Sequence, residues 1–184
     1  MEKIFILFSF YFLIIFSIIG YGNISSLIFK RTYSIGEQGL NGILLLILIS
    51  YLTNFFSPHS IIHNLIIIII GLIAFALFIF QNWRAKIKEL KIIFFIFLIL
   101  FIGLLMYKNH DDFFYYHFPY TLSIINYKKI LGLGLLNHGF RTPSSIFYFN
   151  SLFYLPHIKY FLMNSGAVFI MGFCNIVFLS KINN

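Results

Sequence analysis

Long apolar runs separated by short polar interruptions limit the fold of this chain more than any other feature. Four runs are clear, at about residues 4–21, 41–57, 61–80 and 92–107, and a fifth, softer run covers about 162–180. A helix needs roughly 17–25 apolar residues to cross the hydrocarbon core of a bilayer. Because a backbone in lipid must satisfy its own hydrogen bonds, the runs predict an all-α, multispanning membrane protein with five transmembrane helices.

The composition agrees with a membrane location. Hydrophobic residues make up 60% of the 184 residues and charged residues only 10%, with a mean hydropathy of +0.93. A soluble domain carries about 25% charged residues. The net charge of +8 does not indicate a nucleic-acid partner, because the basic residues lie in short clusters beside the apolar runs. Lysine and arginine in such positions meet lipid headgroups, so membrane lipid is the predicted partner.

The single cysteine and the first apolar run each exclude a further class of protein. Cys174 lies alone inside an apolar run, which excludes a disulfide framework and a cysteine metal cluster. The run from Ile4 to Gly20 is longer than the hydrophobic region of a usual signal peptide, and no A-x-A cleavage site follows it. We therefore expect a retained transmembrane helix rather than a cleaved leader.

The segment 144–156 is apolar and aromatic but short. Pro156 and the sequence His157-Ile158-Lys159 interrupt it before it reaches a spanning length. This length favours one short interfacial or re-entrant helix, and a sixth transmembrane span is the alternative.

Lysine and arginine in short loops predict the orientation, because cytoplasmic loops carry an excess of them. Loops 22–39 and 81–91 are basic, whereas the turn 58–60 between them carries neither residue type. Both basic loops are therefore predicted to be cytoplasmic. Loop 108–145 is then external (periplasmic), in a multi-pass protein of a bacterial inner membrane.

The candidate site lies in residues 92–184, which combine a helix, the large external loop, the interfacial helix and the final transmembrane helix. Residues 1–91 are predicted to form three transmembrane helices with cytoplasmic basic loops. The external loop carries the only adjacent carboxylates, Asp111 and Asp112, directly after an apolar run. Such a pair is suited to binding a divalent cation, or to holding or deprotonating a hydroxyl group.

The alternative is that Asp111 and Asp112 are solvated residues at a helix end. Acids are scarce in this chain, with five in total, and loop 108–145 is long for a mere connector. For these two reasons we keep both residues as candidate catalytic residues.

The histidines of the same loop, His117 and His138, are candidate substrate-binding residues. Histidine and aspartate are ordinary metal ligands, but their spacing here matches no closed metal site. A Mg²⁺ or Mn²⁺ ion held weakly by the acids, together with a phosphate ligand, is the cofactor to be considered.

Arg141 is the third candidate substrate-binding residue. It precedes a predicted helix start at Pro143-Ser144-Ser145. A guanidinium beside the amides of a helix start favours a phosphate group, and an arginine that reaches to the headgroups is the alternative. The aromatic residues of 113–120 fit an interfacial belt, with sugar stacking as a second possible role.

The order of these features resembles a known family. An outward-running helix is followed by Asp111-Asp112, an aromatic stretch with Pro119, Lys128-Lys129, a glycine turn, and Pro143 before an apolar segment. This layout resembles the first large external loop of GT-C-type glycosyltransferases, which are related to protein O-mannosyltransferases and lipid A aminoarabinose transferases. The patches 116–120 (Tyr-His-Phe-Pro-Tyr) and 137–140 (Asn-His-Gly-Phe) are similar to patches in uncharacterised bacterial membrane proteins.

The resemblance covers residues 92–180 and implies sugar transfer from a polyprenyl-phosphate sugar on the external face. By analogy, Asp111 and Asp112 would hold or deprotonate the acceptor, with or without a metal ion. Three predicted helices precede the family-like first helix, and the sequence ends at Asn184, short of the many spans of such enzymes. We therefore expect an N-terminal piece of a longer protein, inactive alone, or one that a further membrane segment or subunit completes.

Two functions remain open: a glycosyltransferase-like enzyme, and a non-catalytic membrane subunit or scaffold whose loop binds a partner. A transporter is less favoured, because the apolar runs contain almost no ionisable groups. Under the enzyme hypothesis, Asp111, Asp112, His117 and Arg141 should meet in one external cavity. The loop itself should form short helices on the bilayer surface.

Overall fold

The computed structural model describes residues 2–106, 112–136, 140–141 and 144–182. Within these ranges every regular element is a helix, and an isolated bridge between Leu155 and Lys159 is the only β pairing. The prediction of an all-α fold is therefore confirmed. The elements are α1 (Glu2–Phe29), α2 (Ile35–Phe56), α3 (Ile61–Met106), the π-helix η1 (Phe113–His117), α4 (Phe118–Asn126), α5 (Leu133–Leu136), α6 (Ser145–Ser151) and α7 (Gly166–Ile182).

Three of the described helices, α1, α2 and α3, are long and apolar enough to cross a membrane. At about 1.5 Å per residue, α1 extends over roughly 42 Å and α2 over roughly 33 Å, and both exceed the hydrocarbon thickness of about 30 Å. Helix α7, which corresponds to the predicted span 162–180, is apolar but has 17 residues. The chain is thus a helical protein with three segments of spanning length in its described part.

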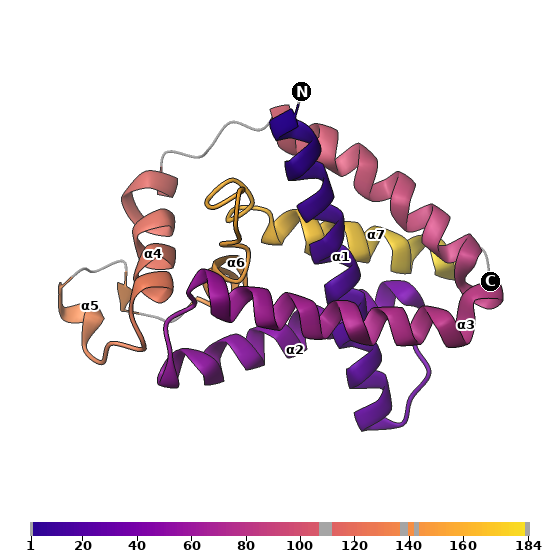
Figure 1. Ribbon diagram of the computed structural model, residues 1–184, viewed down its shortest axis with the longest axis horizontal. Coiled ribbons are helices and arrows are strands. Elements are labelled where there is room, and N and C mark those ends of the chain that lie inside the picture. Colours follow the sequence, from indigo (N-terminus) through magenta and orange to yellow (C-terminus); the bar gives the residue numbers. More distant parts are fainter. Residues whose placement is uncertain (1, 107–111, 137–139, 142–143, 183–184) are drawn as a thin grey trace.

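The predicted loop 81–91 is helical, which corrects the sequence analysis. The predicted spans 61–80 and 92–107 belong to one helix, α3, of 46 residues. Residues 81–91 contain no proline or glycine, and Ala, Arg, Lys, Leu and Glu are good helix formers. These polar residues therefore favour water over lipid around this part of the helix, but they do not end it. Figure 1 shows that the α3 ribbon turns sharply near its middle, giving two legs that diverge like a V.

Helix α1 runs through the centre of the fold and crosses α2 and the first leg of α3 steeply (Figure 1). The crossing is close because of glycine: a Cβ atom at Gly20 would overlap the carbonyl oxygen of Gly71 in α3. A Cβ at Gly42 in α2 would likewise overlap the carbonyl oxygen of Ile18 in α1. Glycine contacts of this kind let membrane helices approach closely, and they hold α2 and α3 on opposite sides of α1.

Helix α2 begins at a capping box. Ser34 is the N-cap, and its amide donates to the Glu37 carboxylate at 2.9 Å, while the Glu37 amide faces the Ser34 hydroxyl at 3.4 Å. Glu89 of α3 also accepts from the amide of Ile35 at 3.0 Å. The predicted basic loop 22–39 is therefore reduced to residues 30–34, because α1 and α2 both extend into it.

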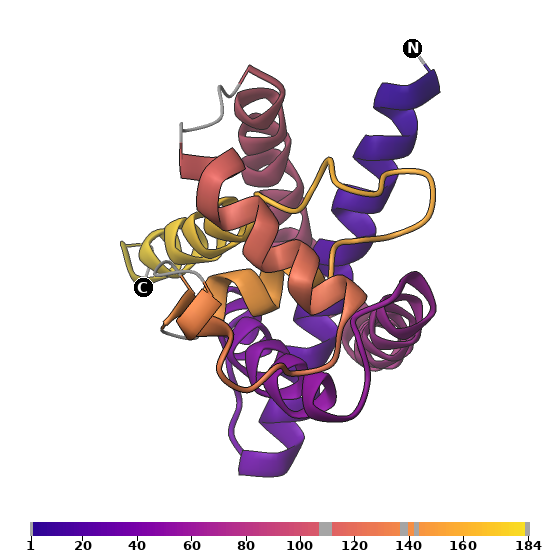
Figure 2. The same cartoon turned by 90° about the vertical axis from the view of Figure 1, so that its left-hand side faces the viewer.

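The short helices η1, α4, α5 and α6 gather at one end of the molecule, where α2 ends and α3 begins (Figures 1 and 2). We call these four elements the cap. Three of them lie in the described part of loop 108–145, so the expectation of short helices there is confirmed for those residues. Helix α6, in the predicted interfacial segment 144–156, has only seven residues and cannot span a bilayer.

Helix α6 differs from a surface-lying helix in its burial. Residues 147–151 are all buried, whereas an interfacial helix exposes one polar face. It packs between α2 and α4 and also touches α7.

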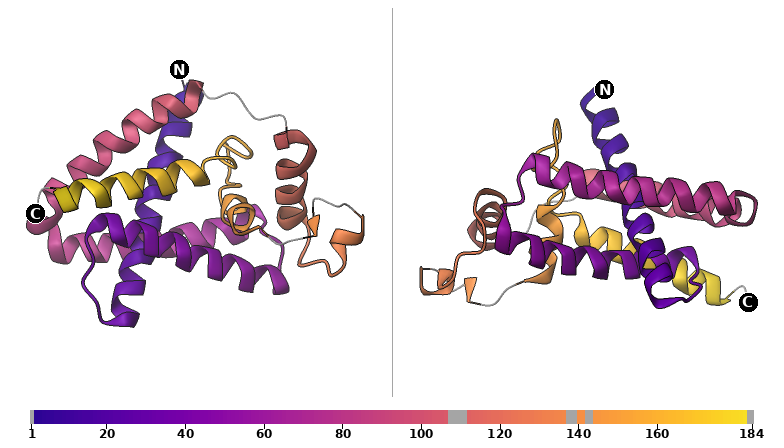
Figure 3. Two further views of the ribbon diagram at one scale, coloured as in Figure 1. Left: turned by 180° about the vertical axis from the view of Figure 1, so that it is seen from behind. Right: turned by 60° about the horizontal axis from the view of Figure 1, so that its bottom comes forward.

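At the end of the molecule opposite the cap lie the turn of α3, the link between α1 and α2, and the end of α7, as Figure 3 shows from behind. The cap and the most basic part of the chain therefore occupy opposite ends.

Candidate functional site

A buried polar network joins the cap to the turn between α2 and α3. Asn64, near the start of α3, is fully buried. Its side-chain amide nitrogen lies 3.0 Å from the carbonyl oxygen of His59, 2.8 Å from that of Ser151 and 3.0 Å from that of Tyr154. Two segments, the α2–α3 turn and the end of α6 with the residues just after it, thus place three carbonyl groups around one donor. This fixes the end of α6 against the α2–α3 turn.

His59 is the second centre of this network and is also fully buried. Its Nε2 lies 3.1 Å from the Ser50 carbonyl, which can only accept, so Nε2 carries a proton. Its Nδ1 lies 2.7 Å from the Ser151 hydroxyl. Burial, and then the nearby His63, lower the pKa of His59 to about 3, against an opposing effect of the Ser50 carbonyl. His59 is therefore a neutral imidazole at neutral pH.

The backbone of residues 124–129 is anchored to the end of α2 by Asn54. The side-chain amide of this buried residue faces the carbonyl oxygens of Ile124 at 3.3 Å and Tyr127 at 3.2 Å. The amide of Lys129 donates to the Asn54 carbonyl at 2.8 Å. This anchoring sets the direction of the Lys129 side chain.

Lys129 and Tyr148 form a close pair inside the cap. The Lys129 ammonium donates to the Tyr148 hydroxyl at 2.7 Å and also lies 5.1 Å from the centre of its ring. Tyr148 comes from α6, and its ring stacks on Tyr51 of α2 at 4.1 Å. Burial, and then the neighbouring Tyr51, raise the pKa of Tyr148 to about 12, so its hydroxyl remains protonated beside the cation.

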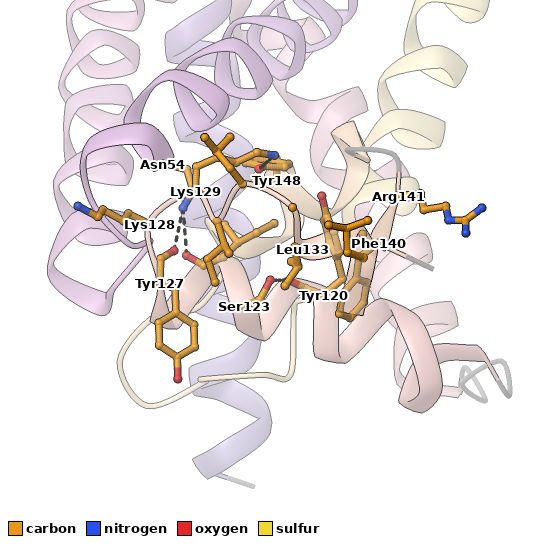
Figure 4. Close-up of a pocket in the computed structure, with 16 residues that line it drawn as sticks. Asn54, Tyr120, Ser123, Tyr127, Lys128, Lys129, Leu133, Phe140, Arg141 and Tyr148 are labelled. Carbon is orange, nitrogen blue, oxygen red and sulfur yellow. Dashed lines mark hydrogen bonds between the residues drawn. The ribbon is translucent and has the colours of Figure 1, made fainter. Parts of the chain in front are cut away.

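A pocket of about 570 Å³ opens beside this pair (Figure 4). We call it the cap pocket, and its walls are Asn54, Tyr120, Ser123, Ile124, the continuous stretch 127–135, Phe140, Arg141 and Tyr148. Among the described residues that line it, Lys128, Lys129 and Arg141 are cations and none is a carboxylate. Figure 4 shows Lys128 and Arg141 at opposite sides of the pocket with their charged ends directed away from it, whereas Lys129 lies across it towards Tyr148.

Tyr120 of α4 adds a second phenol to the cap pocket. It is buried, and its ring packs on Phe140 and Phe147. Burial, and then the nearby Tyr148, raise the pKa of Tyr120 to about 12. The cap pocket therefore combines positive charge with neutral hydroxyl groups on aromatic walls, an arrangement that suits an anionic group attached to an apolar or sugar moiety.

The structure brings only some of the predicted site residues together. Arg141 lines the cap pocket, whereas Asp112 and His117 do not. Asp112 is exposed and directly precedes η1, and the His117 ring packs on Phe147 at 4.9 Å. Asp111 and His138 lie outside the described residues, so the predicted convergence of the acids with His117 and Arg141 stays a prediction.

A metal site is likewise not defined by the described residues. Among them, no group of three or more His, Cys, Asp or Glu side chains comes close enough to hold a metal ion. Because Asp111 is not described, the predicted Mg²⁺ or Mn²⁺ ion on the acid pair stays a prediction.

Sequence reasoning missed Asn54, Lys129 and Tyr148 as parts of a site. The pair Lys128-Lys129 was a visible signal in the polar loop, but its partner lies 19 residues further on, in an apolar segment. Tyr148 was counted there as one more aromatic residue. A polar residue inside an apolar run, such as Asn54, was the second available signal, because intramembrane polar groups need partners.

Comparison with known families places the chain in one of them. Residues 3–184 match the family described as a domain of unknown function, DUF8201, and the chain belongs to that family. Comparisons with curated proteins and with solved structures find no match.

Proposed function

We propose that the chain crosses the membrane five times, with α3 supplying two crossings and the cap on the external (periplasmic) side of a bacterial inner membrane. A straight helix of 46 residues would extend over roughly 69 Å, more than twice the hydrocarbon thickness. The sharp turn of α3 coincides with its charged stretch 81–91, which favours a position outside the hydrocarbon. The basic residues at that end support a cytoplasmic location.

Cysteine labelling in intact cells tests this topology. In a variant with Cys174 replaced by serine, Asn126→Cys in α4 and Ala85→Cys in the turn of α3 both introduce exposed thiols. A membrane-impermeant maleimide should label Asn126→Cys before lysis and Ala85→Cys only after it. Labelling of Ala85→Cys alone in intact cells would show that the orientation is the reverse of the proposed one. Labelling of both would rule out a topology with the cap and the turn of α3 on opposite sides of the membrane.

The function that the cap pocket supports best is the binding of a phosphate group carried by a membrane amphiphile. The observation that carries this proposal is the Lys129–Tyr148 pair, a half-buried cation beside a neutral hydroxyl in a pocket without a carboxylate among its described walls. Ammonium and hydroxyl donors together favour a phosphate. The layout shared with GT-C-type glycosyltransferases makes a polyprenyl-phosphate sugar the preferred ligand, and sugar transfer the corresponding activity.

Binding of farnesyl phosphate, compared with the neutral alcohol farnesol, tests this proposal without a sugar. The wild-type chain in detergent should prefer the phosphate, and Lys129→Ala should weaken phosphate binding about tenfold, which corresponds to about 1.4 kcal/mol, while leaving farnesol unchanged. Lys129→Arg keeps the charge and should retain most of the preference. Lys159→Ala is the matched control, because Lys159 is exposed and does not line the cap pocket.

Native mass spectrometry from detergent micelles gives the binding constants, and circular dichroism checks that each variant is helical. Equal binding of farnesyl phosphate by Lys129→Ala and Lys159→Ala would contradict the proposal, as would equal binding of phosphate and alcohol by the wild type.

A non-catalytic membrane subunit is the second candidate function. The observation that favours it is the absence of a carboxylate among the described walls of the cap pocket, since sugar transfer to a hydroxyl needs a base. Transfer from a polyprenyl-phosphate sugar in native membranes separates the two. The enzyme requires Asp111 or Asp112, so Asp111→Asn or Asp112→Asn should abolish transfer but leave farnesyl phosphate binding intact. Binding without any transfer favours the subunit.

A further inference from the structure

The turn of α3 presents a row of cations at the end opposite the cap. Arg84, Lys88 and Lys91 recur at positions i, i+4 and i+7 of a continuous helical stretch, so each lies three or four residues from the next and they are neighbours on its surface. All three side chains are exposed. Like charges at this spacing repel each other, so this row is electrostatically unfavourable unless an anion lies against it.

The acids at this end of the molecule do not neutralise that row. The Glu89 carboxylate accepts from the Ile35 amide and pairs with Lys86 at 2.7 Å. The Glu37 carboxylate is held in the capping box of α2. Within the described part of the chain, Arg84, Lys88 and Lys91 form no ion pair. Two further segments that lie at this end in Figure 3, the α1–α2 link and the end of α7, also carry exposed cations: Lys30, Arg31 and Lys181.

Exposed aromatic residues border the cations on the same helix. Phe80 lies four residues before Arg84 and is 89% exposed, and Phe95 lies four residues after Lys91 and is 61% exposed. Trp83 is also exposed, and a hollow of about 410 Å³ is lined by residues 80–85. Aromatic rings beside cations, on a helix whose two legs are apolar, match the headgroup level of a bilayer.

We propose that the row Arg84, Lys88 and Lys91 binds the phosphates of anionic phospholipids in the adjoining leaflet. The charge of the row requires an anionic partner, and the apolar and aromatic residues on both sides require that this partner also has acyl chains. An acidic protein would satisfy the cations but would leave Phe80 and Phe95 exposed to water. The inference is independent of what the cap pocket binds, because it concerns other residues at the opposite end.

The composition of the lipid shell tests this assignment. The protein is reconstituted in nanodiscs of four parts phosphatidylcholine to one part phosphatidylglycerol, re-extracted gently, and its retained lipids are counted by mass spectrometry. The wild type should enrich phosphatidylglycerol over its share of the mixture. Because each cation near an anionic surface changes binding roughly fivefold, Lys88→Gln/Lys91→Gln should weaken the preference of this row for phosphatidylglycerol about 25-fold. The retained share of phosphatidylglycerol should then fall close to its share of the mixture, and Lys88→Gln alone should lower it by less.

The matched control is Lys3→Gln/Lys159→Gln, which removes two exposed cations that are not part of the row. It should retain the wild-type enrichment. Raising the salt concentration should reduce the wild-type enrichment and have less effect on Lys88→Gln/Lys91→Gln. Absence of enrichment in the wild type would overturn the proposal and favour an acidic protein as the partner. Equal losses in the test and control pairs would overturn it in favour of a general effect of net charge.

Discussion

Replacing Asn64 with leucine is expected to lower the free energy of unfolding by about 3 kcal/mol. The side-chain amide of Asn64 is the donor that faces the carbonyls of His59, Ser151 and Tyr154. Leucine has a similar size but no donor, so these carbonyls would remain without that partner, and a buried polar group without a hydrogen bond costs about 1–3 kcal/mol. The costs are not additive, because the backbone of 151–154 can shift to find other partners.

Denaturation in detergent micelles, followed by circular dichroism, measures this loss. Asn175→Leu in α7 is the matched control, because it is the same substitution at an exposed position of an apolar helix, and its midpoint should stay near that of the wild type. Hydrogen exchange should localise the effect of Asn64→Leu to residues 148–155. Equal midpoints for the two variants would show that the three contacts contribute nothing to stability.

The fold class could be predicted from the apolar runs, but the course of α3 could not. The charged residues of 81–91 predict a loop, because charge is unfavourable in a membrane span. Helix propensity depends on different properties, and residues 81–91, which lack proline and glycine and include several good helix formers, remain helical. The charge of the same stretch still predicts that α3 leaves the hydrocarbon there, and this stays a prediction. The prediction of a loop in its backbone was wrong.

The network under the cap was not predictable from local pattern. Asn64 and Ser151 are 87 residues apart, and His59 and Ser151 are 92 apart. The periodicity of hydrophobic residues and the lengths of loops do not show which polar residues in apolar surroundings will form hydrogen bonds with each other. The general rule that a buried polar group needs a partner predicts that these residues form hydrogen bonds within the protein. It does not predict that α6 supplies the partners.

Only part of the candidate site could be predicted from the sequence. Arg141 was predicted from its helix-start position and does line the cap pocket. Lys129 was visible as part of a cationic pair, yet its role depends on Tyr148, which burial and stacking hold in α6. The scarcity of acids led to Asp111 and Asp112, and the described neighbour, Asp112, does not reach the cap pocket. Scarcity therefore identifies an unusual residue but does not locate it relative to a cavity.

Acidification from pH 7 to pH 5 is expected to destabilise the fold by about 2 kcal/mol through His59 alone. Its pKa is lowered to about 3 in the folded protein, first by burial and then by His63, whereas an unfolded histidine has a pKa of about 6.5. The unfolded state therefore takes up the proton first. The stabilising contribution is complete above pH 6.5 and falls by about 1.4 kcal/mol per pH unit as the pH drops towards 3.

The surroundings of His59 explain why no neighbour relieves this loss. Ser50 and Thr53 approach from α2, His63 and Asn64 from α3, and Ser151 from α6. None of these side chains is a carboxylate, and the stacked His63 ring, 4.6 Å away, would repel an imidazolium.

Denaturation midpoints at pH 7 and pH 5 should therefore differ strongly in the wild type and in the exposed-histidine control His157→Gln. In His59→Gln the difference should shrink by most of the predicted 2 kcal/mol, even if its stability at pH 7 is already reduced. An unchanged pH dependence in His59→Gln would refute the assignment of the acid sensitivity to this residue.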